Sequence, residues 1–248
     1  MSIRINKYIC ESGLCSRKMA DVYVQQGQVL IDGKLARLGA KVKVNSSVTV
    51  AGRLIRPLTP EQTVIVALNK PVGVVTTALQ THRRNIVDLV KCGSRVVPVG
   101  RLDKDSQGLI LLTNRCALVD KILQSDNQHE KEYVVTVNKP VSDDFIAGLC
   151  QGVPMLGVVT KACVAVKLSE FVFSITLVQG LNRQIRRMCK HFNYSVTRLE
   201  RVRIMGMELE GLKPGQWREL DGQSKSILLA TLGEKLPEQR VAQPSQGA

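Results

Sequence analysis

The residue whose type and setting best suit chemistry is Asp103, a carboxylate on a loop bounded by glycines. It lies between Gly100 and Gly108, two residues after Arg101, and the apolar run 109–112 follows it. Scaffolds commonly present reactive side chains on loops of this kind, anchored by a buried strand. Because an ordinary turn would have the same pattern, the case for a chemical role of Asp103 depends on two further segments.

The first further segment is 130–137, whose apolar and β-branched residues predict a strand with Tyr133 near its start. A tyrosine that enters a strand most often packs in a core or at its rim. The chemical role of Tyr133 therefore depends on what the fold places beside it.

The second further segment is an arginine-rich helix that we predict to start after Gly180, with Asn182 as its N-cap. Four apolar residues at i, i+3, i+4 and i+7 form a stripe that should face the core: Ile185, Met188, Cys189 and Phe192. Four cations with the same spacing lie about 200° around the helix: Arg183, Arg186, Arg187 and Lys190. A solvated charged face is the ordinary explanation. Because no acidic residue at i+4 offsets these charges, their repulsion favours an anionic or carboxylate partner.

The elements around these segments predict an α+β fold that begins with a small module. Residues 1–56 indicate a helix that begins after the N-cap Ser16 and stops at Gly27. Short strands flank Asp32-Gly33, a strong two-residue hairpin turn, and residues 48–50 supply another strand. A basic dimerisation module is the alternative interpretation of this part of the chain.

The proline-containing stretch 57–62 predicts a linker to a larger domain. Residues 63–232 alternate strands and helices without a repeated βαβ order, which predicts a mixed sheet rather than a doubly wound one. The apolar pattern fades in 233–248, and we predict a disordered tail there.

The positive charge of the chain is concentrated in two places. The formal net charge is +14. Residues 1–56 hold ten basic and three acidic side chains, and residues 181–203 hold seven basic side chains and one acidic one. Two basic clusters on a folded protein predict a polyanionic partner, most simply nucleic acid.

The cysteines and the apolar runs argue against metal, secreted and membrane classes of protein. The seven cysteines form no Cys-x-x-Cys pair, and with three scattered histidines they give no metal-ligand spacing. We therefore predict reduced, mostly buried thiols and no bound metal. The N-terminus has no signal-peptide core, and no apolar run reaches the roughly 18 residues of a membrane span. These patterns predict a cytoplasmic protein without a membrane partner.

Together the three segments resemble, in order, the three signatures of RNA pseudouridine synthases of the RsuA branch. The matching stretches are Arg101-Leu102-Asp103, Lys131-Glu132-Tyr133 and Asn182-Arg183-Gln184-Ile185-Arg186-Arg187-Met188. The resemblance covers nearly the whole chain, since residues 69–73 and 199–204 match too and the N-terminal module resembles the S4 RNA-binding domain. Residues 129–133 and 180–189 are most similar to the type F enzymes of the branch.

The resemblance implies a fold, a reaction and a substrate class. The fold would be a small S4 domain followed by a catalytic domain with a mixed, largely antiparallel sheet flanked by helices. The reaction would break the N1-glycosidic bond of uridine, rotate the uracil and rejoin it through C5. Because this isomerisation is redox-neutral and leaves no group over, no cofactor is expected. The substrate would be structured RNA, namely 23S rRNA with tRNA as a second candidate, and a monomer is expected.

The resemblance also assigns roles at the site. Asp103 would be the essential carboxylate, which either attacks the ribose C1′ or assists loss of the 2′ proton. Arg186 would be its arginine partner, which favours the ionised form and fixes the rotamer. Tyr133 would stack on the target base and serve as a general base, and Leu199 would pack in the site. Asp105 suggests a glycosidase-like carboxylate pair, but the match leaves it as a loop residue that caps 106–108.

The resemblance also implies residues that bind RNA without taking part in the chemistry. Arg101 would fill the space that a flipped base leaves, because its planar cation both stacks and pairs with phosphate. A surface arginine beside a carboxylate is the ordinary alternative. The other RNA-binding residues implied are Arg4, Asn6, Lys7, Ser16, Arg17, Lys18, Lys70, Arg183 and Arg187.

Two other functions remain open from the sequence. A non-catalytic RNA-binding or ribosome-assembly protein could keep the same fold, and an RNA N-glycosidase could use the same carboxylate. The first would keep its effect without Asp103, and the second would release free uracil.

Overall fold

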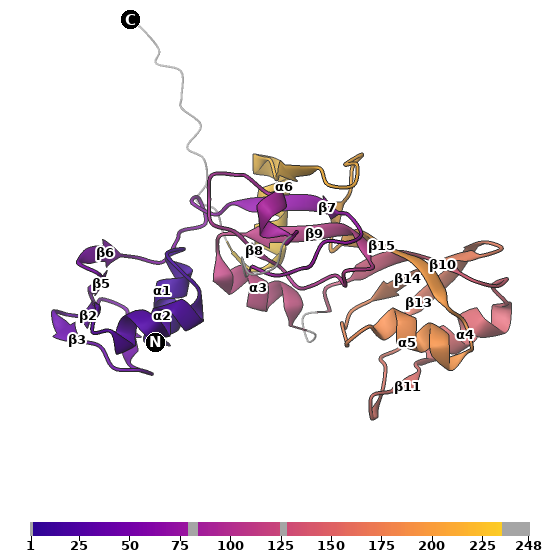
Figure 1. Cartoon of the computed structure of the whole chain (residues 1–248), viewed down its shortest axis with the longest axis horizontal. Helices are drawn as coiled ribbons and strands as arrows, with labels where there is room; N and C mark the ends of the chain where they lie inside the picture. The colour runs from indigo at the N-terminus through magenta and orange to yellow at the C-terminus, as the bar shows by residue number, and fades with distance from the viewer. Residues whose placement is uncertain (1, 79–83, 125–127, 235–248) are drawn as a thin grey trace, which may run out of the picture.

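The computed structural model describes residues 2–78, 84–124 and 128–234, and Figure 1 shows a small N-terminal part joined by one segment to a larger, elongated part. The small part contains the strands β1 (Ser2–Arg4), β2 (Val29–Ile31), β3 (Lys34–Leu35), β4 (Lys41–Lys43), β5 (Val48–Val50) and β6 (Arg53–Ile55). Its helices are α1 (Ile5–Glu11) and α2 (Arg17–Gln25).

The predicted helix cap and hairpin turn of the small part are confirmed. The Oγ of Ser16 accepts a hydrogen bond from the Met19 N–H at 3.2 Å and so caps α2. Strands β2 and β3 pair antiparallel around Asp32 and Gly33, whose φ angles of 50° and 75° are those of the predicted turn. The two helices pack on the strands through a common core that includes Ile5.

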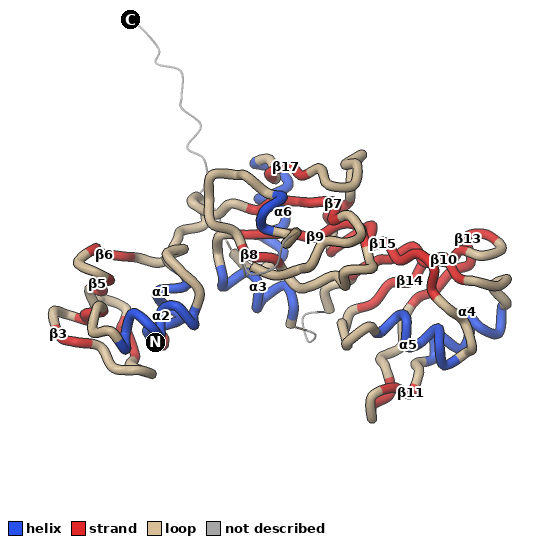
Figure 2. The backbone as a smooth tube through the Cα atoms, in the orientation of Figure 1, coloured by secondary structure: helices blue, strands red, loops and turns tan. Residues whose placement is uncertain are grey.

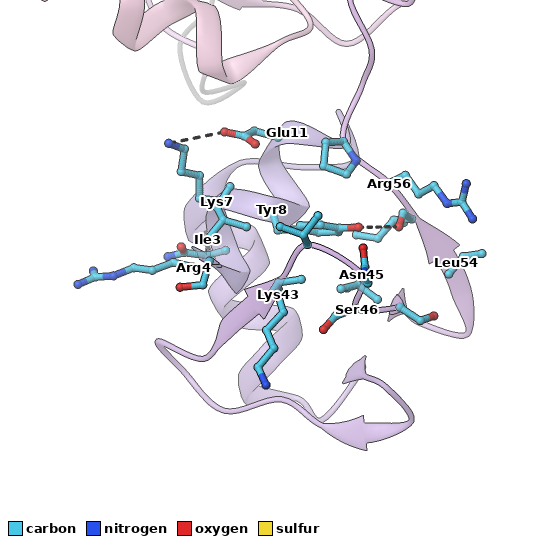
Figure 3. A pocket seen from close by; sticks show the side chains of 18 of the residues that line it. Ile3, Arg4, Lys7, Tyr8, Glu11, Lys43, Asn45, Ser46, Leu54 and Arg56 are labelled. Atoms are coloured by element: carbon cyan, nitrogen blue, oxygen red, sulfur yellow. Dashed lines mark hydrogen bonds and ion pairs between the residues drawn. The ribbon is translucent and has the colours of Figure 1, made fainter.

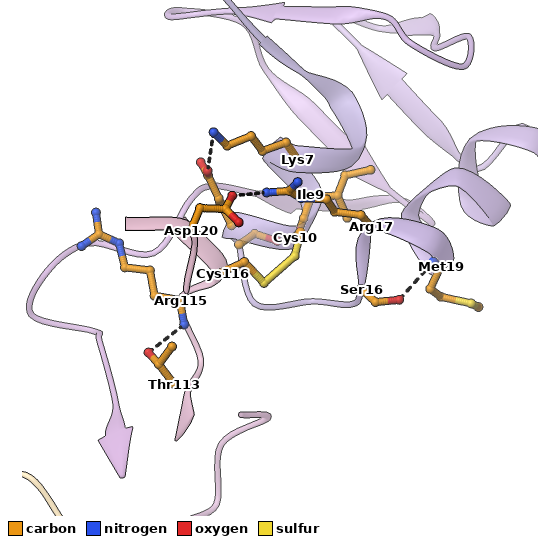
Figure 4. Close-up of a disulfide and its surroundings, with 12 residues drawn as sticks. Lys7, Ile9, Cys10, Ser16, Arg17, Met19, Thr113, Arg115, Cys116 and Asp120 are labelled. Atoms are coloured by element: carbon orange, nitrogen blue, oxygen red, sulfur yellow. Dashed lines mark hydrogen bonds and ion pairs between the residues drawn. A yellow bond between two sulfur atoms is a disulfide. The ribbon is translucent and has the colours of Figure 1, made fainter. Parts of the chain in front are cut away.

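A covalent bond connects the two parts. Cys10 of α1 and Cys116 form a disulfide, and beside it an Nη2 of Arg17 lies 2.8 Å from an Oδ2 of Asp120 (Figure 4). The prediction that all cysteines are reduced thiols is therefore wrong for this pair. Their sequence positions are 106 residues apart, so only the docking of α1 on the larger part brings them together.

The larger part contains one central sheet and four helices among the residues that the structure describes. Its long strands are β7 (Ile65–Lys70), β9 (Gln107–Thr113), β10 (Lys131–Val137), β13 (Val164–Ser169), β14 (Val172–Leu177) and β15 (Val196–Ile204). Its short strands are β8 (Val97–Pro98), β11 (Pro154–Met155), β12 (Val158–Val159), β16 (Met207–Glu208) and β17 (Trp217–Glu219). The helices are α3 (Cys116–Leu123), α4 (Asp143–Gln151), α5 (Gln184–His191) and α6 (Gly222–Thr231), with a 3-10 turn at η1 (Val87–Leu89).

The sheet is mixed and largely antiparallel, as expected. Its strand order is β13-β14-β10-β15-β9-β7-β17 (Figure 2). Strands β15 and β9 form the parallel pair. Helices α4 and α5 cover the end of the sheet near β14 through a core that contains Phe145, Phe173 and Met188. Helices α3 and α6 pack on one face of β7 and β9, and the chain around residues 84–102 packs on the other. Both faces of these two strands are therefore buried, which makes them a rigid support.

The two parallel strands at the centre approach each other closely at one glycine. Gly108 has φ +107°, and a Cβ placed on it would lie 2.2 Å from the carbonyl oxygen of Arg201. The position therefore requires glycine on two grounds, its backbone conformation and its space. This contact joins the two halves of the sheet directly behind the loop that carries Asp103.

The end of the described chain differs in part from the predicted tail. Glu234 forms an ion pair with Arg115 at 2.8 Å between Oε2 and Nη2, and another with Lys121. The remainder of the predicted tail, residues 235–248, lies outside the described residues. Among the helices that the structure describes, none has the length and apolar character needed to cross a bilayer.

Candidate active site

Asp103 is presented by a loop that is fixed at its base. The side chain of Leu102 is buried among the apolar residues behind β9. The hydroxyl of Thr76 donates to the carbonyl oxygen of Leu102 at 2.7 Å and accepts from its N–H at 3.2 Å. The carboxylate that follows is 36% exposed. The neighbouring backbone thus holds Asp103 at the surface with little freedom.

Lys70 supports the same loop from inside. Its side chain is fully buried, and its Nζ donates to the carbonyl oxygens of Ser106 at 2.7 Å and Pro71 at 3.0 Å. Burial lowers the pKa of Lys70 to about 8, against the opposing effect of the charges on Asp105 and Asp103. A buried ammonium cannot contact RNA from this position. We therefore correct the prediction that Lys70 binds RNA: it holds the loop of Asp103 in place.

A network of two carboxylates and two arginines lies at the tip of the loop. The Nη1 of Arg183 lies 3.3 Å from an Oδ2 of Asp103, and the same guanidinium makes two hydrogen bonds to Asp105, at 3.1 and 3.0 Å. The Nη2 of Arg186 donates to the carbonyl oxygen of Asp105 at 3.0 Å and to the Ser106 hydroxyl at 3.3 Å. Its Nη1 donates to a backbone carbonyl of β15 at 3.1 Å.

This network corrects two expectations. The arginine that pairs with Asp103 is Arg183, whereas Arg186 lies 3.4 Å from an Oδ2 of Asp105 and anchors the loop backbone. Asp105 is half exposed and ion-paired with both arginines rather than capping the following residues. The hydrogen bonds from Arg183, together with the charge of Arg186, lower the pKa of Asp105, and Asp105 in turn raises the pKa of Arg183.

Helix α5 supplies these arginines and packs as its periodicity predicts. Ile185, Met188 and Cys189 are buried in the core, which confirms the apolar stripe. The predicted N-cap is wrong, because the cap position is taken by Arg183 in a left-handed conformation (φ 49°) without a side-chain cap bond. Asn182 instead accepts hydrogen bonds from the exposed Arg187, at 3.1 Å through its carbonyl oxygen and 3.2 Å through its amide oxygen.

The structure brings the predicted catalytic residues of two distant segments to one cavity. The cavity has a volume of about 110 Å³, and its lining includes Arg101, Asp103, Tyr133, Arg183 and Leu199. An outer hollow of about 400 Å³ shares Asp103 and Arg183 with it. Arg183 therefore stands between the inner cavity and the open surface.

This arrangement suits a flat, polar ring joined to an anionic group. Tyr133 and Leu199 offer aromatic and apolar surface for the ring, while Asp103 offers a carboxylate at the rim. The guanidinium groups of Arg101 and Arg183 suit phosphate at the entrance. A nucleotide unit of a polyanion has this combination of properties.

The small N-terminal part has a groove of its own. This groove has a volume of about 1020 Å³, and Figure 3 shows Tyr8 near its centre with Arg4, Lys7, Lys43 and Arg56 around it. Of the predicted RNA-binding residues, the groove lining includes Arg4, Asn6, Lys7 and Arg17.

Several of those residues have partners within the protein. An Nδ2 of Asn6 donates to Asp21 at 3.0 Å, Lys7 lies 3.7 Å from Glu11, and Arg17 pairs with Asp120 of the larger part. Ser16 caps a helix, as described above. Lys18 is exposed in the first turn of α2.

Sequence reasoning missed two residues that shape the site. Thr76 and Ser106 are both buried and bind the loop backbone and Arg186, respectively. A threonine and a serine in irregular segments have no spacing that marks them. Only their position beside Asp103 in the fold identifies them.

Comparison with known proteins shows what the chain is similar to. Residues 64–191 match the family model described as RNA pseudouridylate synthase, and residues 3–48 match the S4 domain model. Proteins named dual-specificity RNA pseudouridine synthase RluF, from Escherichia coli (strain K12) and Shigella flexneri, are 58% identical over 219 residues, 88% of this chain and 76% of theirs. Ribosomal large subunit pseudouridine synthase B of Bacillus subtilis (strain 168) is 31% identical over 88% of this chain and 91% of its own. A solved structure titled "Crystal structure of pseudouridylate synthase" superposes with a TM-score of 0.67 at 25% identity, covering 91% of this chain and 99% of that one.

Proposed function

The chain belongs to the RNA pseudouridylate synthase family, in its RsuA branch, and from this premise we propose that its substrates are uridines of 23S rRNA together with a second RNA, tRNA. It is an RNA pseudouridine synthase with an S4 domain. The names of its relatives support the finer proposal, since one names the large ribosomal subunit and another dual specificity. The single observation that carries the site assignment is the cavity shared by Asp103 and Tyr133.

Asp103 performs the chemistry in this proposal. The glycosidic bond breaks when its carboxylate either attacks C1′ of the ribose or assists loss of the 2′ proton. In both routes the bond between C1′ and N1 breaks, and the uracil turns within the cavity and bonds to C1′ through C5. The carboxylate leaves C1′, or the 2′ proton returns, as the new bond forms. C5 loses one proton and N1 gains one, so that no atom is gained or lost overall. The fixed backbone at Leu102 places the carboxylate before substrate arrives, which lowers the entropic cost of reaching the reactive geometry.

Tyr133 and Leu199 hold the freed base. They come from adjacent strands, β10 and β15, and line the same cavity. A base that stacks on the tyrosine ring stays beside the ribose while it rotates, and in this proposal the phenol removes the C5 proton at the end. Arg101 is exposed at the entrance, where it can occupy the gap in the RNA and contact phosphate.

The two basic regions hold the RNA. The groove of the small N-terminal part, which is the S4 domain, carries Arg4 and Lys7. Helix α5 carries Arg187 on its exposed side. Because phosphate contacts release counterions, we expect the logarithm of RNA affinity to fall with the logarithm of salt concentration, with a slope of about 0.7 per contact on single strands. The S4 part then sets the position of the RNA, and the cavity accepts the flipped uridine.

The experiment is to incubate the protein, in buffer with EDTA and no cofactor, separately with 23S rRNA and tRNA transcripts. Pseudouridines are mapped by carbodiimide modification and primer extension, with Asp103→Asn as the control. The proposal expects discrete new stops on both RNAs with the wild type alone. Stops on neither RNA would contradict it, stops on one alone would remove the other substrate, and released uracil would indicate an N-glycosidase.

A further inference from the structure

Two carboxylates compete for one arginine beside the cavity. Arg183 binds Asp105 through both terminal nitrogens, at 3.1 and 3.0 Å, but reaches Asp103 through one nitrogen at 3.3 Å. We propose that Asp105 is a positioning residue. It binds Arg183, so that Arg183 does not form a bidentate ion pair with the catalytic carboxylate of Asp103. This inference rests on the proposed role of Asp103.

The preferred geometry of arginine explains why such a competitor is needed. A guanidinium binds a carboxylate most strongly through two parallel N–H···O bonds. Without the anion at Asp105, the nearest carboxylate for Arg183 is Asp103, which it already contacts. In the observed arrangement the Oδ1 of Asp103 has no hydrogen-bond partner among the described residues, and Asp103 lines the cavity.

Asp105 can act in this way because it is itself held from behind. Arg186 contacts its carboxylate at 3.4 Å and its carbonyl oxygen at 3.0 Å. Arg186 is only 14% exposed and is tied to the Ser106 hydroxyl and to the carbonyl oxygen of Val196. Asp105 therefore cannot follow Arg183 towards Asp103. Arg183, whose backbone is fixed in a left-handed conformation, therefore stays between the two carboxylates.

The consequence for the reaction is the same for either role of Asp103. Attack on C1′ and removal of the 2′ proton both need a carboxylate oxygen whose lone pair is free. Two charged N–H donors on that carboxylate would lower its reactivity and block its approach to the ribose. The anion at Asp105 therefore contributes to turnover without touching the substrate.

The test is a double-mutant cycle on RNA turnover at saturating RNA. Asp105→Asn should lower kcat at least about tenfold, which corresponds to roughly 1.4 kcal/mol, without weakening RNA binding. Adding Arg183→Gln should then raise kcat at least about threefold above that of Asp105→Asn alone, because the arginine that binds both carboxylate oxygens of Asp103 is gone. Asp144→Asn, an exposed residue of α4, removes the same charge elsewhere and serves as the control.

The outcomes separate a positioning role from a structural one. A kcat of Asp105→Asn close to the wild-type value, or a double variant no faster than Asp105→Asn, overturns the inference. If Asp105→Asn does not fold, Asp105→Glu is combined with Arg183→Lys instead, since lysine cannot clamp a carboxylate with two prongs. Asp105→Glu should then lower kcat less in the Arg183→Lys background than in the wild type, and an equal or larger loss there overturns the inference.

A further control distinguishes this inference from the proposed function. Asp103→Asn is measured in the same assay. If it retains turnover, the proposed function of the site fails. If it is inactive while the cycle shows no recovery, only the role of Asp105 fails.

Discussion

At the scale of single residues, the interior near the candidate site contains three buried cations. Lys70, Lys131 and Arg201 are each at most 8% exposed, and each donates to a backbone carbonyl oxygen. Burial, with the nearby charge of Arg201, lowers the pKa of both lysines. Of the three, Lys70 contacts the loop of Asp103 directly, and its burial costs some stability while it holds that loop in one position.

The lowered pKa of Lys70 predicts a specific dependence of stability on pH. Its pKa is about 8 in the folded protein and about 10.5 in the unfolded chain, so the unfolded chain binds more protons between these values. The free energy of unfolding should therefore rise with pH across this window, by up to roughly 3 kcal/mol, relative to Lys70→Met. Urea unfolding of both proteins from pH 7 to 10.5 measures the difference. The same comparison with Lys167→Met, at an exposed position of β13, should be flat, and a flat difference for Lys70→Met would contradict the account.

The sequence predicts residue chemistry better than residue surroundings. Asp103 and Tyr133, from two of the three segments, meet in one cavity together with Leu199, which the resemblance implied. Lys70, which the resemblance implied to be an RNA contact, is instead fully buried, although lysine is seldom buried. Its burial depends on a carbonyl oxygen of Ser106, 36 residues further along the chain, which no local pattern reveals.

At the scale of elements, the parallel contact of β9 and β15 sets the position of the loop. Gly108 pairs with Arg201 at the point where the two strands meet. The Arg201 Nε donates to the carbonyl oxygen of Leu109 at 2.7 Å, which ties the same two strands through a side chain. The loop that ends at Gly108 therefore moves with the sheet.

Gly108→Ala should be strongly destabilising. The added Cβ would meet backbone atoms of Arg201 at 2.2 and 2.5 Å, which only a separation of the strands can relieve. We expect a loss of about 3–5 kcal/mol in the free energy of unfolding. Gly215→Ala also has a positive φ, of +88°, but nothing within 4 Å, so it should lose only about 1–2 kcal/mol from backbone strain. Equal losses in denaturant unfolding would show that the close approach is unimportant.

Helix α5 shows where element prediction succeeds and fails. The apolar stripe follows from the helical period alone and is buried as predicted. The first residue of the helix does not follow from the period. Arg183, in a left-handed conformation, takes the cap position that was predicted for Asn182, because its ion pairs with Asp103 and Asp105 favour this arrangement. Tertiary contacts thus decide the boundary, while the period decides the face.

At the scale of the whole molecule, α3 connects the S4 part to the loop of Asp103. Helix α3 begins at Cys116 and carries Asp120 about one turn later, and both residues bind the S4 part. Its last residue, Leu123, packs so closely on Gly100 that an added Cβ there would lie 2.9 Å from the leucine side chain. Gly100 begins the loop of Asp103. The pairing of two cysteines 106 residues apart could not be predicted from their spacing, because it depends on how the parts dock.

Removing the disulfide should loosen the S4 part. Glu61 lies exposed in the segment between the parts, so a glutamyl endopeptidase can cut there when the segment opens. Cleavage after Glu61 should be about threefold or more faster in Cys116→Ser than in the oxidised wild type, because opening is no longer restrained. Cys92→Ser, which removes a free cysteine, should cleave at the wild-type rate. Equal rates for Cys116→Ser and the wild type would mean that other contacts hold the S4 part.

The most direct test of the central claim is the turnover of Asp103→Asn on an RNA that the wild type modifies. The amide keeps the shape of the side chain but can neither attack C1′ nor accept the 2′ proton. We predict that pseudouridine formation under single-turnover conditions falls by more than about a thousandfold, while RNA affinity, measured separately by filter binding, changes by less than about threefold. Turnover near the wild-type rate with RNA fully bound would contradict the assignment of Asp103 as the catalytic residue.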